Sequence, residues 1–167
     1  MLKKLDLKIL FKLYNFNINH RRLSKAVVFI SQFSSIFFST IYFAAVIYLI
    51  YNDKVLKEFI LIPAVFYFLA KLIPYLYNRI RPFAKHNIKA LVEQRKDHSF
   101  PSTHTGSSLI ISLAFLEINP EIGITMIFLA ILTALSRIMT AVHYPSDILG
   151  TWLIVLILHF GFLNFLI

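Results

Sequence analysis

Apolar residues in this chain gather in long runs that are separated by short polar breaks. At about 1.5 Å of rise per residue, an apolar helix of about 20 residues crosses the ~30 Å hydrocarbon core of a bilayer. The pattern therefore predicts an all-α fold, an integral membrane bundle of about five transmembrane helices. The predicted spans cover residues 26–51, 59–77, 104–116, 122–139 and 147–167.

The N-terminus differs from these runs, because lysines alternate there with leucine, isoleucine and phenylalanine. Such a density of charge within residues 2–14 excludes a membrane span, so we expect an amphipathic helix at the membrane interface, within a basic segment over residues 1–25. The segment carries no secretory signal pattern, so the first span is expected to direct membrane insertion. The lysines are Lys3, Lys4, Lys8 and Lys12.

Two connections between the predicted spans hold most of the polar candidates for chemistry. Residues 79–102 form the longest connection, and loops of this length in compact domains are usually functional. With five spans, this connection and the turn at 140–146 lie on the same membrane face. Pro63 and Pro74 predict a kink in the second span. The sequence shows no domain boundary or repeat, so a single domain over residues 1–167 is predicted.

Composition places the chain in the membrane. Of its 167 residues, 58% are hydrophobic and 15% charged, with a mean hydropathy of +0.72, which is far more apolar than a soluble domain tolerates. Much of the net charge of +9 flanks the apolar runs, so we expect anionic lipid headgroups as partners and no nucleic acid. Cysteine is absent and the acidic residues are scattered, so we expect no thiolate chemistry, metal or cofactor. The prediction is a multi-pass protein of the cell membrane without an obligate protein partner.

The residues Pro101-Ser102-Thr103-His104 precede the third apolar run. A serine between a proline and an apolar helix is typical of an N-cap, and the free amides of the first helical turn favour a bound anion. Ser102 and the amide of Thr103 are therefore candidate phosphate ligands, with His104 beside them. Taken alone, this tetrapeptide is better explained by a plain helix cap with a surface histidine.

A second polar cluster closes the fourth run. Arg137 offers a planar fork of donors that suits phosphate oxygens. His143 follows six residues later and Asp147 four residues after that. Asp147 can accept the proton of one ring nitrogen and leave the other nitrogen free as a nucleophile. The alternative for Asp147 is a carboxylate that the dipole favours at a helix start, and both roles can coexist.

Three further basic residues are candidates for binding phosphate. Arg79 and Arg81 follow the second span, where flanking positive charge is the ordinary explanation. Lys71 lies inside that span. A lysine at membrane depth is a functional candidate, with snorkelling to the interface as the alternative.

Together these clusters resemble the type 2 phosphatidic acid phosphatase superfamily, the lipid phosphate phosphatases related to vanadium haloperoxidases. The three motifs of that family run Lys-x6-Arg-Pro, Pro-Ser-Gly-His and Ser-Arg-x5-His-x3-Asp. The resemblance covers residues 71–150 with motifs in the family order. The third motif is matched by Ser136, Arg137, His143 and Asp147, the second by Pro101, Ser102 and His104, and part of the first by Arg81 and Pro82.

The chain departs from the family pattern at two positions. Pro74 stands where the first motif has lysine, so Lys71 or Arg79 would substitute for it. Thr103 stands where the second motif most often has glycine. Some undecaprenyl diphosphate phosphatases of the family also carry a non-glycine residue there, and the patterns Arg-x-Arg-Pro-Phe and Ser-Phe-Pro-Ser-x-His-Thr are similar to theirs.

The resemblance implies a metal-independent lipid phosphatase. His143 would attack phosphorus to form a phosphohistidine, while His104 would protonate the leaving oxygen and later activate water. Asp147 would support His143. The phosphate oxygens would be held by Arg81, Ser102, Thr103 and Arg137, together with Lys71 or Arg79.

The sequence leaves alternatives open for both the substrate and the class of function. The motif pattern favours conversion of undecaprenyl diphosphate to undecaprenyl phosphate, and phosphatidylglycerophosphate or phosphatidate is the alternative substrate. A membrane transporter or channel whose charges line a cavity is an alternative of another class. A family member that binds lipid phosphate without hydrolysing it is a third possibility.

The distribution of charge and the resemblance disagree on sidedness. Basic residues are concentrated before the first span and in the 79–102 connection, and the positive-inside rule then places the N-terminus and the active site in the cytoplasm. In the resembled family, recycling of undecaprenyl diphosphate is usually assigned to the outer face. Both orientations stay open at the level of sequence.

Overall fold

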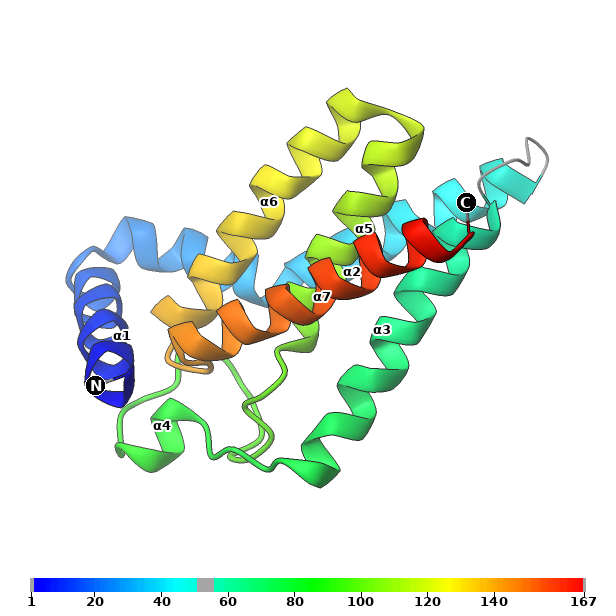
Figure 1. Ribbon diagram of the computed structural model, residues 1–167. Helices are drawn as coiled ribbons and strands as arrows, with labels where there is room; N and C mark the ends of the chain where they lie inside the picture. Colours follow the sequence, from blue (N-terminus) through cyan, green and yellow to red (C-terminus); the bar gives the residue numbers. More distant parts are fainter. Residues whose placement is uncertain (1, 51–55, 167) are drawn as a thin grey trace.

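The computed structural model describes residues 2–50 and 56–166, and within these residues all regular structure is helical (Figure 1). This confirms the predicted all-α fold. The predicted end of the first span at residue 51 and part of the polar break after it lie outside the described residues, as does residue 167. The helices are α1 (Leu2–Asn19), α2 (Arg21–Ile50), α3 (Leu56–Leu76), α4 (Pro82–Lys85), α5 (Thr103–Ile118), α6 (Pro120–Met139) and α7 (Pro145–Leu166).

Several helices have the character of membrane spans, which confirms a multi-pass membrane bundle. By length and composition, three helices within the described residues can cross a membrane. They are Arg21–Ile50, Phe59–Leu76 and Pro120–Met139, and α7 adds a shorter apolar stretch over Pro145–Gly161. The total of about five spans stays a prediction, because α5 has only 16 residues. Helix α3 continues through Pro63 and Pro74 without a break.

Helix α5 lies at the centre of the bundle, where it contacts α2, α3, α6 and α7. Ten of its residues are buried, so apolar and small polar side chains face neighbours on all sides. The approach of α3 is close at Gly106, since a Cβ built there would overlap the ring of Phe66, which is itself buried. The central position of α5 fixes its first turn, which carries His104.

Helix α1 is docked on the protein and does not lie apart from it. Leu10 is fully buried against residues of α6, α7 and the turn between them. The Tyr14 hydroxyl donates to the carbonyl of Lys89 at 3.0 Å, and the Asn17 side chain donates to the carbonyl of Met139 at 3.0 Å. The helix is amphipathic as predicted: its four lysines are exposed, and the bundle covers the side that carries Leu10, whereas Leu5, Ile9, Phe16 and Ile18 are exposed.

The polar connections meet at one end of the molecule. Figure 1 shows α1, α4 and the α6–α7 turn at the lower end, opposite the α5–α6 turn. Backbone hydrogen bonds join the long connection to the short turn, from Phe83 to Ala141 and from Leu91 to Thr140. The predicted proximity of the two connections is thus present in the structure.

Candidate active site

The ring of His143 lies in the buried turn between α6 and α7 and is 1% exposed. Its Nδ1 is 2.6 Å from the backbone carbonyl of Ser99, and its Nε2 is 2.9 Å from Nη1 of Arg81. A carbonyl only accepts a hydrogen bond and a guanidinium only donates one. The proton therefore sits on Nδ1, and the lone pair of Nε2 faces Arg81.

The His143 ring is neutral at ordinary pH. Burial lowers the pKa of His143 from 6.5 to about 4, against an opposing effect of the Asp147 carboxylate, and the positive charges of Arg81 and Arg137 lower it further. A neutral imidazole with a free Nε2 lone pair is the form required of a nucleophile.

Asp147 lies beside His143 but does not make the direct hydrogen bond that the sequence predicted. Its Oδ2 is 3.7 Å from Nδ1 of His143 and accepts from the Ser99 hydroxyl at 2.6 Å and from the Tyr144 amide at 2.9 Å. The reason is that the carbonyl of Ser99 occupies the acceptor position on the ring. Asp147 thus acts on His143 through its charge and through its hold on Ser99.

Arg81 is a buried cation held entirely by backbone and ring acceptors. Its guanidinium donates to the carbonyls of Asp97, Val142 and His98 at 3.0–3.1 Å. Burial lowers the pKa of Arg81 to about 10, which leaves it charged at neutral pH. Because these acceptors are neutral, the positive charge of Arg81 remains available to an anion.

Arg137, in the last turn of α6, has donors that no protein group satisfies. It is 1% exposed, and Nη1 donates to the carbonyl and hydroxyl oxygens of Ser31, both at 2.9 Å. Its Nε and Nη2 are buried without a partner. Unsatisfied buried donors are costly, so their presence indicates a ligand site.

The start of α5 carries two further polar residues of the candidate site, Ser102 and His104. Ser102 is the N-cap residue, but its side chain makes no capping bond and its buried Oγ has no partner; its amide donates to Thr151 at 2.9 Å. Thr103 begins α5 and is partly exposed. The charges of Arg137, His143 and Arg81 all act on His104, which places its ring within this cluster.

Arg79 is engaged by carboxylates and is not free for phosphate. Its Nη2 donates to Asp6 at 2.8 Å and its Nη1 to Asp147 at 2.5 Å, and its guanidinium stacks 4.0 Å from the centroid of the Tyr144 ring. This arrangement differs from the predicted phosphate-binding role. The sequence could not show this contact with Asp6, which is far away along the chain.

Lys71 lies on the exposed surface of α3, where its ammonium is 5.3 Å from the centroid of the Tyr67 ring. The cluster around His143 is assembled from other residues. Neither candidate for the missing lysine of the first motif is thus placed by its contacts as a phosphate ligand.

Sequence reasoning missed three residues that hold the site together. Ser31 fixes Arg137, Ser99 bridges His143 and Asp147, and Asp6 holds Arg79. A serine inside an apolar span was the available signal for Ser31. Across the described residues, no group of three or more His, Asp or Glu side chains is placed to hold a metal ion.

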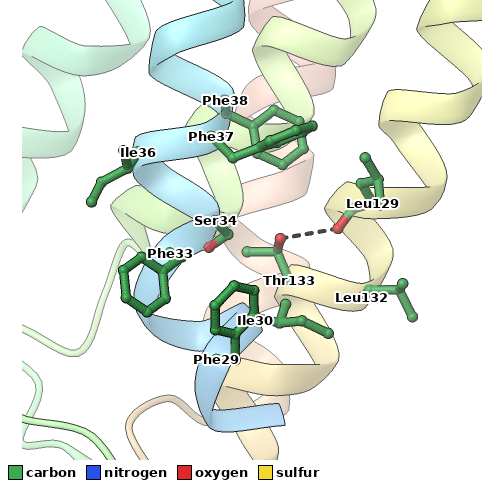
Figure 2. Close-up of a pocket in the computed structure, with 10 residues that line it drawn as sticks. All are labelled: Phe29, Ile30, Phe33, Ser34, Ile36, Phe37, Phe38, Leu129, Leu132 and Thr133. Carbon is green, nitrogen blue, oxygen red and sulfur yellow. Dashed lines mark hydrogen bonds between the residues drawn. The ribbon is translucent and has the colours of Figure 1, made fainter. Parts of the chain in front are cut away.

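An apolar groove of about 390 Å³ lies between α2 and α6 (Figure 2). Phe29, Phe33 and Phe37 line it from α2, and Leu129 and Leu132 line it from α6. Its polar members Ser34 and Thr133 lie on the same two helices as Ser31 and Arg137, three and four residues away along the chain. One helical turn thus separates the groove from the buried arginine.

The sequence is similar to one family profile and to proteins of known sequence. The sequence profile of the PAP2 superfamily matches residues 55–166. The chain is 40% identical over 94 residues to undecaprenyl-diphosphatase BcrC of Bacillus subtilis, covering 56% of this chain and 49% of the relative. It is 35% identical over 81 residues to bacitracin transport permease protein BcrC of Bacillus licheniformis, covering 48% of this chain and 40% of that relative. The chain thus spans about half the length of the curated relatives it matches, or less.

Two solved structures share the fold. Aquifex aeolicus LpxE superposes with a TM-score of 0.79 at 24% identity, covering 96% of this chain and 95% of that chain. The PAP2-type phosphatidylglycerolphosphate phosphatase of Bacillus subtilis superposes with a TM-score of 0.78 at 21% identity, covering 98% of this chain and 85% of that chain. At these identities the likeness shows the fold alone.

Proposed function

Because the chain belongs to the PAP2 superfamily, we propose that it is a membrane phosphatase that hydrolyses undecaprenyl diphosphate to undecaprenyl phosphate. The observation that carries the proposal is the unpartnered Nε and Nη2 of the buried Arg137, next to the neutral ring of His143. Each unsatisfied donor costs on the order of 1–3 kcal/mol, which oxygens of a bound phosphate would recover.

In the first step, the Nε2 lone pair of His143 attacks the terminal phosphorus. A P–N bond forms while the bond from phosphorus to the leaving oxygen breaks. His104, which takes up a proton when the negative charge of the substrate faces it, gives this proton to the leaving oxygen. Arg81 lies 2.9 Å from Nε2, so a phosphate oxygen would replace Nε2 as its acceptor when the substrate binds. Asp147 and the Ser99 carbonyl stabilise the positive charge that develops on the ring.

In the second step, water attacks the phosphohistidine and the P–N bond breaks. His104, now neutral, takes the proton of this water, so that both histidines return to their initial states and inorganic phosphate leaves. Negative charge on the phosphate oxygens is compensated in both steps by Arg81 and Arg137, with donors from Ser102 and the amide of Thr103.

The apolar groove between α2 and α6 suits the lipid tail of such a substrate (Figure 2). It begins one helical turn from Arg137, which binds the headgroup in this proposal, and its lining is aromatic and aliphatic. The name of the Bacillus subtilis relative favours a polyprenyl diphosphate. Acyl chains of phosphatidylglycerophosphate or phosphatidate can occupy the same surface, so these lipids remain the alternative substrates.

The second candidate function is transport, which the name of the Bacillus licheniformis relative favours. A transporter has no need for a neutral ring such as that of His143, held between the Ser99 carbonyl and the guanidinium of Arg81. Hydrolysis that depends on this histidine therefore separates the two functions.

Phosphate release by the purified chain in detergent tests the proposal. Undecaprenyl diphosphate, phosphatidylglycerophosphate and phosphatidate are supplied in turn, and undecaprenyl diphosphate is expected to give the highest kcat/KM. His143→Ala is expected to lower the rate by at least about 1,000-fold, and His20→Ala, an exposed histidine, is the control. Retained turnover in a folded His143→Ala protein would remove His143 from the nucleophile role.

A further inference from the structure

We infer that Asp6 of α1 is a positioning residue for the reaction: it balances the charge of Arg79, so that Asp147 keeps a net negative charge for His143. This inference rests on the proposed function. It gives the N-terminal helix a part in the chemistry, although that helix lies outside all three family motifs.

The carboxylate of Asp6 is buried and fully engaged. The residue is 7% exposed, although it lies on a helix whose lysines are in solvent. Its Oδ2 accepts from Nη2 of Arg79 at 2.8 Å and from the Ser146 hydroxyl at 2.5 Å, and its Oδ1 accepts from the Ser146 amide at 2.9 Å. Ser146 immediately precedes Asp147 and Arg79 bonds it, so Asp6 holds two residues that adjoin the carboxylate of Asp147.

Arg79 joins the two carboxylates. Nη1 donates to Oδ1 of Asp147 at 2.5 Å while Nη2 contacts Asp6, and the flat face of the guanidinium rests on Tyr144. Although burial alone would lower it, the pKa of Arg79 is raised above its ordinary value by Asp147 and Asp6. The group of three therefore contains two negative charges and one positive charge.

This count of charges matters for His143. With Asp6 present, the group carries a net charge of −1, and its nearest member, Oδ2 of Asp147, lies 3.7 Å from Nδ1 of His143. This charge stabilises the positive charge that develops on the ring during attack. Without Asp6, Arg79 would neutralise Asp147 alone, and the net charge beside His143 would fall to zero. The geometry of Asp147 would still be held by Ser99 and Tyr144.

Anchoring of the helix does not by itself account for a buried carboxylate at this position. Leu10, Tyr14 and Asn17 share the face of α1 that carries Asp6, and their contacts already attach the helix to the bundle. A buried charge costs desolvation that an apolar contact does not. A role in the balance of charge explains why a carboxylate stands there.

Kinetics of three variants of the full chain test the inference. Asp6→Asn keeps the size of the side chain and removes its charge, and we expect kcat to fall about 10-fold with KM unchanged, since the substrate does not touch Asp6. Asp6→Asn combined with Arg79→Gln removes both charges and restores the net charge of −1, so kcat should recover several-fold over Asp6→Asn. Asn17→Ala loosens α1 without altering any charge and should leave kcat within about twofold of the wild type.

A measurement that needs no turnover separates this inference from the proposed function. Vanadate can bond to Nε2 as a mimic of the five-coordinate phosphorus, whereas inorganic phosphate binds without such a bond. Calorimetry should show about 10-fold weaker vanadate binding in Asp6→Asn and unchanged phosphate binding.

The outcomes are distinct. Wild-type kcat and wild-type vanadate affinity in Asp6→Asn would overturn the inference, as would a double variant no faster than Asp6→Asn. A wild-type protein that hydrolyses no lipid phosphate would defeat the proposed function, and weaker vanadate binding in Asp6→Asn would then still support the role of Asp6. Absence of vanadate binding in the wild type would overturn both.

Discussion

At the scale of single residues, the environment of His143 selects one tautomer and one charge state. The Ser99 carbonyl accepts a hydrogen bond from the protonated Nδ1, and Arg81 faces the lone pair of Nε2. Burial is the main cause of the lowered pKa of His143, and the two nearby arginines, which repel an imidazolium, lower it further. The same two cations attract a phosphate, so one arrangement prepares both the nucleophile and its target.

Acid is expected to destabilise the fold through His143. Its pKa in the folded protein is about 4 against 6.5 when exposed, so the unfolded chain binds the proton more tightly and stability is lost as pH falls from 6.5 towards 4. Between pH 7 and pH 5 the loss amounts to about 2 kcal/mol. Thermal unfolding in detergent of the wild type and His143→Gln at both pH values measures it.

His143→Gln is the reference for the wild type in that experiment, because the two proteins share all other ionisable groups. The wild type should lose more thermal stability than the variant on acidification. Equal losses in the two proteins would show that His143 is already accessible to protons in the folded state.

The sequence predicted the members of the site better than their partners. Because a reaction needs particular residue types in a fixed order, motif spacing predicted one site from His143, Asp147, Arg137 and His104, whose catalytic roles stay predictions. It did not show that a backbone carbonyl, and not Asp147, bonds the ring, since carbonyls are the same in every residue. Nor did it show that Arg79 bonds two carboxylates, because Asp6 is 73 residues away.

At the scale of elements, the first turn of α5 sets the position of His104 relative to the turn after α6. Its start is fixed from two directions, by the Ser102 amide on Thr151 of α7 and by the close approach of α3 at Gly106. Only Thr105 separates His104 from Gly106, so a displacement at the glycine reaches the histidine.

Gly106→Ala is expected to lower both stability and activity. The added Cβ would overlap the ring of Phe66, and this ring is buried and cannot rotate into solvent. Overpacking of this kind costs about 1–3 kcal/mol. Thermal unfolding and phosphate release measure the two effects.

The smaller side chain of Phe66→Leu should relieve the overlap. The double variant Gly106→Ala with Phe66→Leu is therefore expected to regain part of the stability lost in Gly106→Ala. A double variant that is no more stable than Gly106→Ala would show that α3 does not constrain α5 at this position.

The prediction for α1 shows what amphipathicity can and cannot tell. Alternation of lysine with apolar residues correctly indicated an amphipathic helix, but it did not show that part of the apolar surface packs on the protein. The structure covers the side around Leu10 with α6 and α7, while Leu5, Ile9 and Phe16 are exposed. A hydrophobic stripe has the same pattern whether lipid or protein covers it, so only the three-dimensional arrangement separates the two.

At the scale of the whole molecule, exposed basic residues gather at the end that holds His143. The lysines of α1 lie there, and the connection before α5 adds further cations, whereas Arg79 and Arg81 are engaged within the site. The opposite end has Glu117 and Glu121 at the α5–α6 turn. From the positive-inside rule we therefore predict that the end with His143 faces the cytoplasm.

Labelling of single cysteines tests this orientation, because the chain contains no cysteine of its own. Glu93→Cys and Glu121→Cys place a thiol at exposed positions, one in the connection before α5 and the other at the start of α6. These two segments lie at opposite ends of the bundle (Figure 1). An impermeant maleimide added to intact cells should label Glu121→Cys, and it should label Glu93→Cys only after permeabilisation. The reverse result would mean that the basic residues around the site serve the anionic headgroup of the substrate, and that they do not determine how the chain inserts.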